Sequence, residues 1–311
     1  MDTAQPVLFF DHQFPDGYAD LLEGRAVAVG PDEADLPRAD GAVVGSVWRW
    51  DGPRIAAGSR LRVVSRIGVG YDNVDVRAAA EAGVAVCYAP DAPTVSTAEH
   101  AIALMLAVTK GLLGAHNRAM AAVPSPPPTS LELDGRTLGL VGFGRIGRRV
   151  ATAAASLGMA VVVHDPYIGT GDGVAELVSL DELLATADVV SLHAPADPST
   201  HHLMSAAAFQ HMRPGGYLVN CARGSLVDQE ALLAALDADQ LAGAALDVTD
   251  PEPLPVGHPL LVHPRVFVTP HIASSTVAGR RRLYAHAIDN ALAALDGRPA
   301  TYVPTPQGGA S

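Results

Sequence analysis

The feature that most constrains this chain is a glycine-rich turn between an apolar run and an alanine-rich run. In VGFGRIG, Gly142, Gly144 and Gly147 follow LGLV directly and precede RRVATAAAS. The spacing GxGxxG is weak evidence alone, because glycine serves many turns. In this position the first glycine permits a tight turn, the second lets the backbone approach a pyrophosphate, and the third lets helix and strand pack closely. The pattern predicts a strand, a turn and a helix that bind a dinucleotide.

Short β-rich runs alternate with alanine-rich stretches on both sides of a proline-rich segment, Val123 to Ser130. This alternation is typical of βα units on a parallel sheet, and several prolines make the segment itself a loop. The expected strands are VLFF, AVAVG, GAVVG, LRVVSRIG and VAVCY in the first series, and LGLV, AVVVH, DVVSL, GYLV, GAALDV and VFVTP in the second. The six later runs predict a doubly wound sheet of the Rossmann type.

The chain has 311 residues, which is long for a single core. We expect an α/β protein with two Rossmann-like domains, each a doubly wound parallel sheet, and a discontinuous first domain. Its parts are residues 1–96 and 279–311, and the second domain is 97–278. Ser96 and Glu99 have the spacing of a capping box, which predicts a long buried helix starting near Thr97. A final helix over 278–295 would return to the first domain, and another would be capped at Ser179 with Glu182.

Charge and cysteine content exclude several function classes. The net charge of −12 argues against nucleic-acid or anionic-membrane surfaces, which need clustered Lys and Arg. Cys87 and Cys221 lack CxxC spacing, so we expect reduced thiols, with neither a disulfide framework nor a zinc or other metal site. No run approaches the ~20 apolar residues that span a bilayer, and no signal sequence is evident. A small-molecule site in a cytoplasmic protein is the expectation.

The second strand of the dinucleotide unit ends in Asp165, at the spacing of the acid that hydrogen-bonds the adenosine ribose. The alternative is an ordinary strand-end aspartate that caps a turn. No Lys or Arg lies between Asp165 and Arg213, so a 2′-phosphate would meet a carboxylate with no local cation. The sequence therefore favours NAD over NADP.

Three polar residues follow successive apolar runs: Arg223 after GYLVN, Glu252 after GAALDV and His271 after VFVTP. Ligands of open parallel sheets bind beyond the carboxyl ends of the strands, so these side chains could share one crevice. Reduction of a 2-keto acid needs a cation on the carboxylate and a proton donor for the developing alkoxide, which suit Arg223 and His271. Glu252 would support the protonated imidazole.

Each of the three has a structural alternative. Arg223 could form a surface ion pair, Glu252 could be solvated in its proline-containing loop, and His271 could be a structural residue. Among the twelve histidines, however, His271 is the one that we place at a strand end beside the cofactor site. This position favours the chemical interpretation.

Two further features could bind ligands. Asp247, within GAALDV, is a buried carboxylate that needs a partner, either the nicotinamide carboxamide or a donor of the protein. Gly68 and Gly70, in RIGVGYDN, suggest a loop whose N–H groups could bind a carboxylate, although a plain turn is equally allowed.

Taken together, the chain resembles the D-isomer-specific 2-hydroxyacid dehydrogenases over nearly its full length. The matching stretches, in the order of that family, are RIGVGYDNVDVRAA, TAEHA, LGLVGFGRIGRRVA, HDPY, LHAP, MRPGGYLVNCARGSLVDQEAL, GAALDV, DPEPL and VTPHIA. The resemblance implies an NAD-dependent enzyme that moves a hydride between the cofactor and C2 of a small D-2-hydroxy or 2-keto acid. It also implies a flavodoxin-like substrate-binding domain and a homodimer formed by the cofactor domains.

The resemblance also implies the role of each residue. Arg223 binds the substrate, Glu252 pairs with His271, and His271 is the acid/base. Val69 and Gly70 meet the substrate carboxylate. The implied cofactor contacts are Gly142, Gly144, Arg145, Ile146 and Gly147 at the pyrophosphate, Asp165 at the ribose, Cys221 and Asp247 on the nicotinamide side, and Pro195 and Thr200.

Within the family, RIGVGYDNVDV, HDPY and HHLM look closest to the C-terminal-binding-protein branch of NAD(H)-sensing corepressors. That makes Arg66 a possible second substrate cation, with an exposed strand-end arginine as the alternative. The loop Ser46 to Gly52 carries two tryptophans where we expect substrate contact. The alternatives to a metabolic oxidoreductase are therefore a corepressor-type binding protein and, disfavoured by the ordered motifs, a hydrolase that keeps NAD bound.

Overall fold

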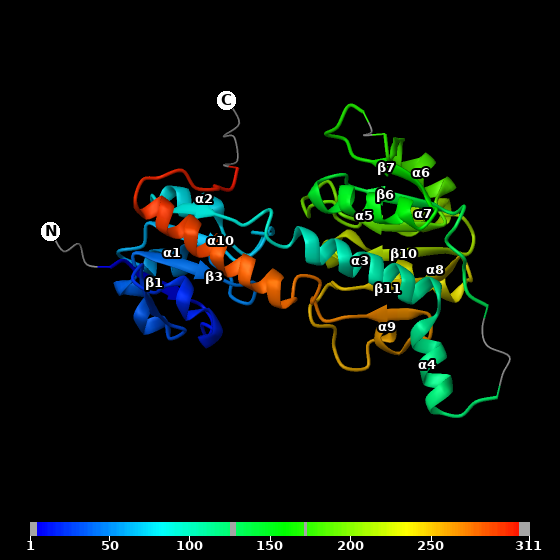
Figure 1. Ribbon diagram of the computed structural model, residues 1–311, viewed down its shortest axis with the longest axis horizontal. Helices are drawn as coiled ribbons and strands as arrows, with labels where there is room; N and C mark the ends of the chain where they lie inside the picture. The colour runs from blue at the N-terminus through cyan, green and yellow to red at the C-terminus, as the bar shows by residue number, and fades with distance from the viewer. Residues whose placement is uncertain (1–4, 125–128, 171–172, 305–311) are drawn as a thin grey trace. The chain divides into compact units, whose positions relative to one another are not determined.

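The computed structural model describes residues 5–124, 129–170 and 173–304 (Figure 1). The chain divides into two compact units. Unit 1 comprises Met1–Pro93 and Thr276–Ser311, and unit 2 comprises Thr94–Ser275. Each boundary lies three residues before the one expected from the sequence, at 93/94 and 275/276 instead of 96/97 and 278/279.

Unit 1 contains a five-stranded parallel sheet in the order β2-β1-β3-β4-β5. Its strands are short, and valine and alanine are their commonest residues, which suits a sheet with helices on both faces. Their bounds are β1 Val7–Phe10, β2 Val27–Val29, β3 Gly41–Val44, β4 Val63–Arg66 and β5 Ala85–Cys87. All five expected strands of the first series are present.

Helices cover both faces of this sheet. On one face the long helix α10 (Val277–Leu295) buries Tyr284, Ile288 and Leu292 against the strand residues Leu8, Phe10, Val43 and Val63. The predicted return of the last helix to the first domain is confirmed. On the opposite face a second apolar cluster includes Phe9, Trp50 and Ile55. The remaining helical segments are the 3-10 helices η1 Asp16–Leu21 and η2 Glu33–Arg38, and the α-helices α1 Gly52–Ala57 and α2 Val76–Glu81.

Unit 2 contains a seven-stranded parallel sheet in the order β12-β11-β10-β9-β6-β7-β8. The order reverses at β6, the strand before the glycine turn, and such a reversal is where ligands bind in open sheets. The strands are β6 Thr137–Val141, β7 Ala160–His164, β8 Glu176–Leu177, β9 Val189–Leu192, β10 Gly216–Asn220, β11 Leu241–Leu246 and β12 Val266–Val268. The expected α/β class with two parallel sheets is confirmed. The two-residue strand β8 is additional to the six expected.

Apart from α4, the α-helices of unit 2 pack their apolar faces on the two sides of the sheet. Ser179 caps α6 by accepting a hydrogen bond from the N–H of Glu182 at 3.2 Å, as predicted. The helices are α3 Thr94–Thr109, α4 Leu112–Met120, α5 Arg145–Ser156, α6 Leu180–Thr186, α7 Ala206–His211, α8 Gln229–Asp237 and α9 Pro259–Val262, with the 3-10 helix η3 Gly224–Leu226.

Helix α3 begins at Thr94, three residues before the predicted start, so this boundary was wrong. Thr94, Ser96 and Thr97 are all buried within the first turns. Burial therefore extends the helix through the serine that we expected to cap it. In the described residues no single helix is long and apolar enough to cross a membrane, and α3 with α4 meets the criteria only as a pair bent by 59°. The centre of the predicted proline-rich loop, 125–128, lies outside the described residues.

Candidate active site

The three glycines of the turn after β6 have three different environments. Gly142 has a φ of 96°, and a Cβ there would lie 2.7 Å from the carbonyl carbon of His193. A Cβ on Gly147 would lie 2.5 Å from the carbonyl oxygen of Gly142. At Gly144, by contrast, an added Cβ would meet no atom within 4 Å. The first and third glycines are needed for packing, and the second faces open space where a diphosphate could approach.

Helix α5 begins directly at this turn. Gly144 is its N-cap residue and supplies no side-chain cap, so side-chain capping does not satisfy the first N–H groups of this twelve-residue helix. Arg145 is exposed and Ile146 is half-buried at its first positions. The guanidinium of Arg148 lies 4.3 Å from the centroid of the Phe143 ring. The positive end of a helix that follows a glycine turn is the setting that an anionic diphosphate requires, so these residues fit a dinucleotide.

Asp165 follows β7 and stabilises the same turn. Its Oδ2 accepts a hydrogen bond from the Phe143 N–H at 2.8 Å, and its Oδ1 accepts one from the Tyr167 N–H at 2.9 Å. Capping, the alternative that the sequence left open, is therefore present. A ribose contact remains a prediction, since a carboxylate has lone pairs beyond these two bonds.

The loop after β9 closes on itself through Thr200. The Thr200 hydroxyl donates to the Pro195 carbonyl at 2.8 Å and accepts from the Asp197 N–H at 2.9 Å. Pro195 is exposed beside it. Their predicted cofactor contacts remain predictions, and the geometry shows a loop at the carboxyl edge of the sheet that is held by its own hydrogen bonds.

His193 also occupies a strand end near the glycine turn, so the statement that His271 alone does so was wrong. It follows β9, and its carbonyl group lies so close to Gly142 that a Cβ on Gly142 would clash with it. Its Nε2 lies 2.9 Å from the hydroxyl of the buried Ser191. Burial lowers the pKa of His193 from 6.5 to about 4, so the imidazole is neutral near pH 7. The motif LHAP was a signal that could have identified it.

The loops after β11 and β12 bring Glu252 and His271 together. The Nδ1 of His271 lies 2.6 Å from Oε1 of Glu252, and the two side chains are 38% and 40% exposed. His271 has a φ of 51°, a conformation that costs energy for a residue with a Cβ. Its N–H donates to the Asp247 carbonyl at 2.8 Å. A carboxylate that accepts from Nδ1 leaves Nε2 as the nitrogen available for proton transfer.

Asp247 is buried, and its donors come from the protein itself. Oδ1 accepts from the Thr269 hydroxyl at 2.6 Å and the Ile272 N–H at 2.9 Å, and Oδ2 accepts from the Ala273 N–H at 2.8 Å. The Nε2 of His100 lies 3.3 Å from Oδ1. Burial raises the pKa of Asp247, but these four donors outweigh burial and hold the pKa below its usual value.

Of the two partners that the sequence left open for Asp247, donors of the protein are therefore present, and a contact with the nicotinamide remains a prediction. The carboxylate binds the Thr269 hydroxyl before His271 and the backbone N–H groups of the two residues after it, so it helps to position the imidazole. Sequence reasoning missed His100, which also lies 3.1 Å from the Thr269 hydroxyl. The stretch TAEHA contains it, but its spacing alone does not connect it to β11.

Arg223 lies on the loop after β10, the neighbour of β11 in the sheet. It is half-buried, and its Nη1 donates to the Ala222 carbonyl at 2.7 Å. A Cβ on the next residue, Gly224, would lie 2.0 Å from the carbonyl carbon of Thr249. Only glycine therefore lets the loop of Arg223 pack against the loop that leads to Glu252. Cys221 is buried, and desolvation raises the pKa of its thiol.

In unit 1, the predicted substrate-binding residues Arg66, Val69 and Gly70 lie at the carboxyl end of β4. Arg66 is only 8% exposed, which excludes the alternative of an exposed strand-end arginine.

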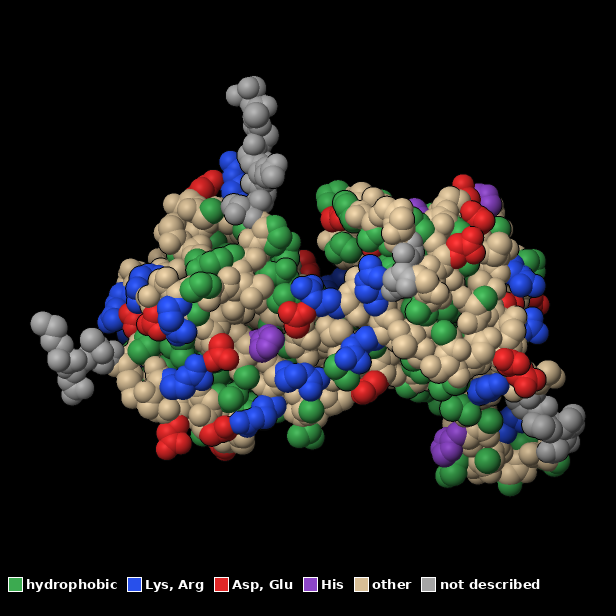
Figure 2. Space-filling view, turned by 45° about the horizontal axis from the view of Figure 1, so that its top comes forward, with side chains coloured by type: hydrophobic (Ala, Val, Ile, Leu, Met, Phe, Trp, Pro, Cys, Tyr) green, Lys and Arg blue, Asp and Glu red, His purple; other side chains and the backbone are tan. Residues whose placement is uncertain are grey.

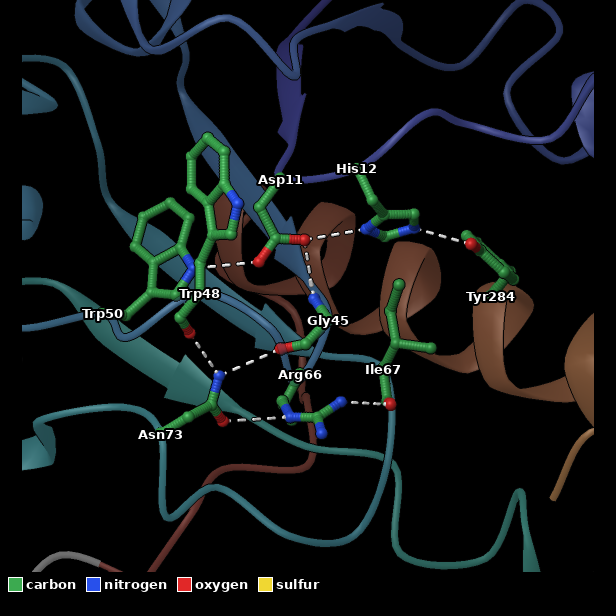
Figure 3. Close-up of polar contacts among 9 residues, drawn as sticks. All are labelled: Asp11, His12, Gly45, Trp48, Trp50, Arg66, Ile67, Asn73 and Tyr284. Carbon is green, nitrogen blue, oxygen red and sulfur yellow. Dashed lines mark hydrogen bonds and ion pairs between the residues drawn. The ribbon is translucent and has the colours of Figure 1, made fainter. Parts of the chain in front are cut away.

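The expectation of substrate contact for both tryptophans of the loop 46–52 was wrong for Trp50. Trp50 is fully buried, and its indole N–H donates to the Asp11 carboxylate at 3.1 Å (Figure 3). Trp48 is half-buried and packs against Phe9.

Comparisons with known proteins identify the family. Residues 102–273 match the family described as "D-isomer specific 2-hydroxyacid dehydrogenase, NAD binding domain". A D-3-phosphoglycerate dehydrogenase of Mycobacterium leprae is 39% identical over 286 residues, which cover 89% of this chain and 54% of that protein. The chain spans about a third to a half of the length of the curated relatives it matches, with 36% for one from Arabidopsis thaliana.

Many solved structures match this chain, and the following two match nearly the whole of it. A protein of Thermus thermophilus has a TM-score of 0.87 at 38% identity, with 96% of this chain and 100% of that chain covered. A D-lactate dehydrogenase of Aquifex aeolicus, solved with NAD and lactic acid, has a TM-score of 0.82 at 28% identity, with 94% and 96% covered. The segment 102–273 is thus an NAD-binding domain, and the chain belongs to the D-isomer-specific 2-hydroxyacid dehydrogenase family.

Proposed function

We propose that this protein is an NAD-dependent dehydrogenase that interconverts a small D-2-hydroxy acid and the corresponding 2-keto acid. The observation that carries the proposal is the His271–Glu252 pair at 2.6 Å, in a unit whose glycine turn starts a helix with glycine as its N-cap residue. An acid/base group and a dinucleotide site on one parallel sheet are what a hydride-transfer enzyme needs.

Each residue has a role in the proposed reduction. Bound NADH would supply the hydride to carbon 2. Arg223 binds the substrate carboxylate and polarises the carbonyl, because a guanidinium stabilises negative charge that develops on oxygen. His271 donates the proton on Nε2 to that oxygen, and Glu252 stabilises the protonated imidazole through Nδ1. In the oxidation the same imidazole accepts the proton.

Unit 1 is the proposed substrate-binding domain, and unit 2 is the proposed cofactor domain. In unit 1, the N–H groups of Val69 and Gly70 bind the substrate carboxylate, and Arg66 adds positive charge. In unit 2, Asp165 binds the ribose, which favours NAD over NADP. The other proposed cofactor contacts are Gly142, Gly144, Arg145, Ile146, Gly147, Pro195, Thr200, Cys221 and Asp247.

A homodimer through unit 2 is part of the proposal. Helix α4 has no buried residue, and it exposes Leu112, Leu113 and Met120, the last to 75%. Figure 1 shows α4 projecting from the sheet of unit 2, and apolar side chains gather on this projection in Figure 2. A second copy would cover such a surface.

The protein is also proposed to be cytoplasmic. In the reducing cytoplasm its two free, buried cysteines would stay reduced.

A panel of 2-keto acids with NADH and NADPH tests the function. We expect oxidation of NADH with at least one of glyoxylate, hydroxypyruvate, pyruvate and aromatic keto acids, with a preference over NADPH. Arg223→Ala should remove most turnover and leave the Kd of NADH unchanged. Tight NADH binding without turnover on any acid would contradict the proposal and favour a binding protein of the corepressor type.

A further inference from the structure

A second group of polar side chains gathers at the carboxyl edge of the unit 1 sheet (Figure 3). Asp11 follows β1, Gly45 follows β3 and Arg66 ends β4, and these three strands are neighbours in the sheet. Hydrogen bonds join these residues into one network with His12, Trp48, Trp50, Ile67, Asn73 and Tyr284. The proposed reaction assigns a role only to Arg66.

Asn73 is the central connection of this network. Its Nδ2 donates to the Gly45 carbonyl at 3.0 Å and to the Trp48 carbonyl at 2.8 Å. Its Oδ1 accepts from Nε of Arg66 at 3.2 Å. A primary amide has two N–H donors and one acceptor oxygen, so every polar group of the side chain is engaged. Asn73 therefore fixes the start of the loop 45–50 relative to the Arg66 guanidinium.

The guanidinium of Arg66 lies against the loop that follows β4. Its Nη1 donates to the Ile67 carbonyl. Gly68 has a φ of 148°, and a Cβ there would lie 3.2 Å from Nη1 of Arg66. In the part of the chain that the structure describes, no hydrogen bond is formed by the N–H groups of Val69 and Gly70. Positive charge and two N–H donors thus share one short segment, which is a favourable setting for a carboxylate.

The loop 45–50, to which Asn73 is hydrogen-bonded, is itself bound to the buried carboxylate of Asp11. Asp11 accepts from the Gly45 N–H at 2.8 Å and the Trp50 indole N–H at 3.1 Å, and it lies 2.7 Å from Nδ1 of His12. The Nε2 of His12 lies 2.6 Å from the Tyr284 hydroxyl on α10. Since the sheet and α10 hold this loop in place, the two carbonyls that accept from Asn73 have fixed positions.

We propose that Asn73 is a positioning residue for substrate binding, which acts by orienting Arg66. With Arg66 held against the loop, its charge and the N–H groups of Val69 and Gly70 act on the same substrate carboxylate. A preorganised guanidinium binds an anion without the cost of ordering a flexible side chain at that moment. The inference rests on the substrate-binding role proposed for these residues.

The test compares Asn73→Ala with Asn290→Ala. Asn290 is a matched control in the same unit, because it also joins two backbone groups, the Tyr88 carbonyl and the Thr301 N–H, each at 2.9 Å. We expect Asn73→Ala to raise the KM of the keto acid about tenfold, with kcat changed by less than about threefold, as expected for lost uniform binding. Asn290→Ala should leave KM unchanged, and neither variant should alter the Kd of NADH.

A double-mutant cycle with Arg66→Met shows whether Asn73 acts through Arg66. In that background Asn73→Ala should have no further effect on KM, because the guanidinium that it orients is gone. The chain has two tryptophans, both in the loop 45–50, so their emission reports directly whether this loop is intact in each variant. Should Asn73→Ala fail to fold, Arg66→Lys keeps the charge without the planar fork and should raise KM similarly.

The outcomes separate this inference from the proposed function. Wild-type KM in a folded Asn73→Ala, or an equal rise of KM in the Arg66→Met background, would overturn the positioning role. If the wild type turns over no keto acid, the proposed function fails instead. Calorimetric titration of oxamate, an unreactive keto-acid analogue, into the NADH complex of each variant then tests the same role. Equal oxamate affinity in wild type and Asn73→Ala would overturn it.

Discussion

The two units place polar residues at the same position, the carboxyl edge of a parallel sheet, but use them differently. In unit 2, His271 and Glu252 form a pair in which each side chain is more than a third exposed. In unit 1, the Asp11 side chain is 2% exposed, and its two oxygens contact three donors. The edge of a parallel sheet therefore predicts where polar groups gather. Whether such a group performs chemistry or holds a loop depends on what covers it.

The largest expected effect concerns a buried carboxylate in unit 2. Asp247→Ala leaves the Thr269 hydroxyl and the N–H groups of Ile272 and Ala273 without their acceptor. We expect a loss of about 3–5 kcal/mol in the free energy of unfolding, measured by urea denaturation. Because the folded pKa of Asp247 lies below 3.8, its contribution is complete above that pH and is lost only as the pH falls through the folded pKa. A loss below about 1 kcal/mol would show that the buried hydrogen bonds of Asp247 do not stabilise the fold.

The second-largest expected effect concerns the exposed pair of His271 and Glu252. His271→Ala should lower kcat about 100-fold or more, equivalent to about 2.7 kcal/mol, because the proton donor is removed. His211, exposed at the end of α7, provides a control in the same unit, and His211→Ala should change kcat by less than about twofold. Steady-state kinetics with saturating NADH make the comparison. Equal rates for the two variants would show that the pair is structural.

His193 makes an intermediate case, since it is half-buried at a strand end. Its folded pKa of about 4 lies below the ordinary 6.5, so the unfolded chain takes up a proton first as the pH falls. Between pH 6.5 and 4 the wild type should lose about 2 kcal/mol of stability through this group, less than the full shift because the ring is not fully buried. His193→Gln should lack this part of the loss. Urea denaturation at pH 7.5 and 4.5 checks the difference, and identical pH dependence would contradict the assignment.

The smallest effect is expected in unit 1. Trp50→Phe keeps an aromatic ring in the core but removes the indole donor to Asp11, so about 1–2 kcal/mol of stability should be lost. Trp48→Phe is the matched control, because Trp48 contributes ring contacts with Phe9 and Arg54, and it should cost less. Both should leave the Kd of NADH unchanged. A larger loss for Trp48→Phe would reverse the assignment of the two tryptophans.

Several elements followed from local sequence. The glycine turn could be placed because its spacing, the preceding apolar run and the following helix former are all local signals. Ser179 was assigned as a cap for the same reason. The start of α3 was predicted three residues too late, because burial of Thr94 and Ser96 overrode the local capping pattern. The strand β8 was missed because two residues carry no periodicity.

The sequence by itself determined the α/β class, the dinucleotide turn and the strand ends from which Arg223, Glu252 and His271 emerge, since hydrophobic periodicity and glycine spacing act over a few residues. Only the tertiary structure decided that Asp247 holds the segment around His271, that Trp50 is a core residue and that Asn73 joins Arg66 to a distant loop. These contacts depend on which strands become neighbours and on how deeply each polar group is buried. Both are set by packing between segments far apart in the chain.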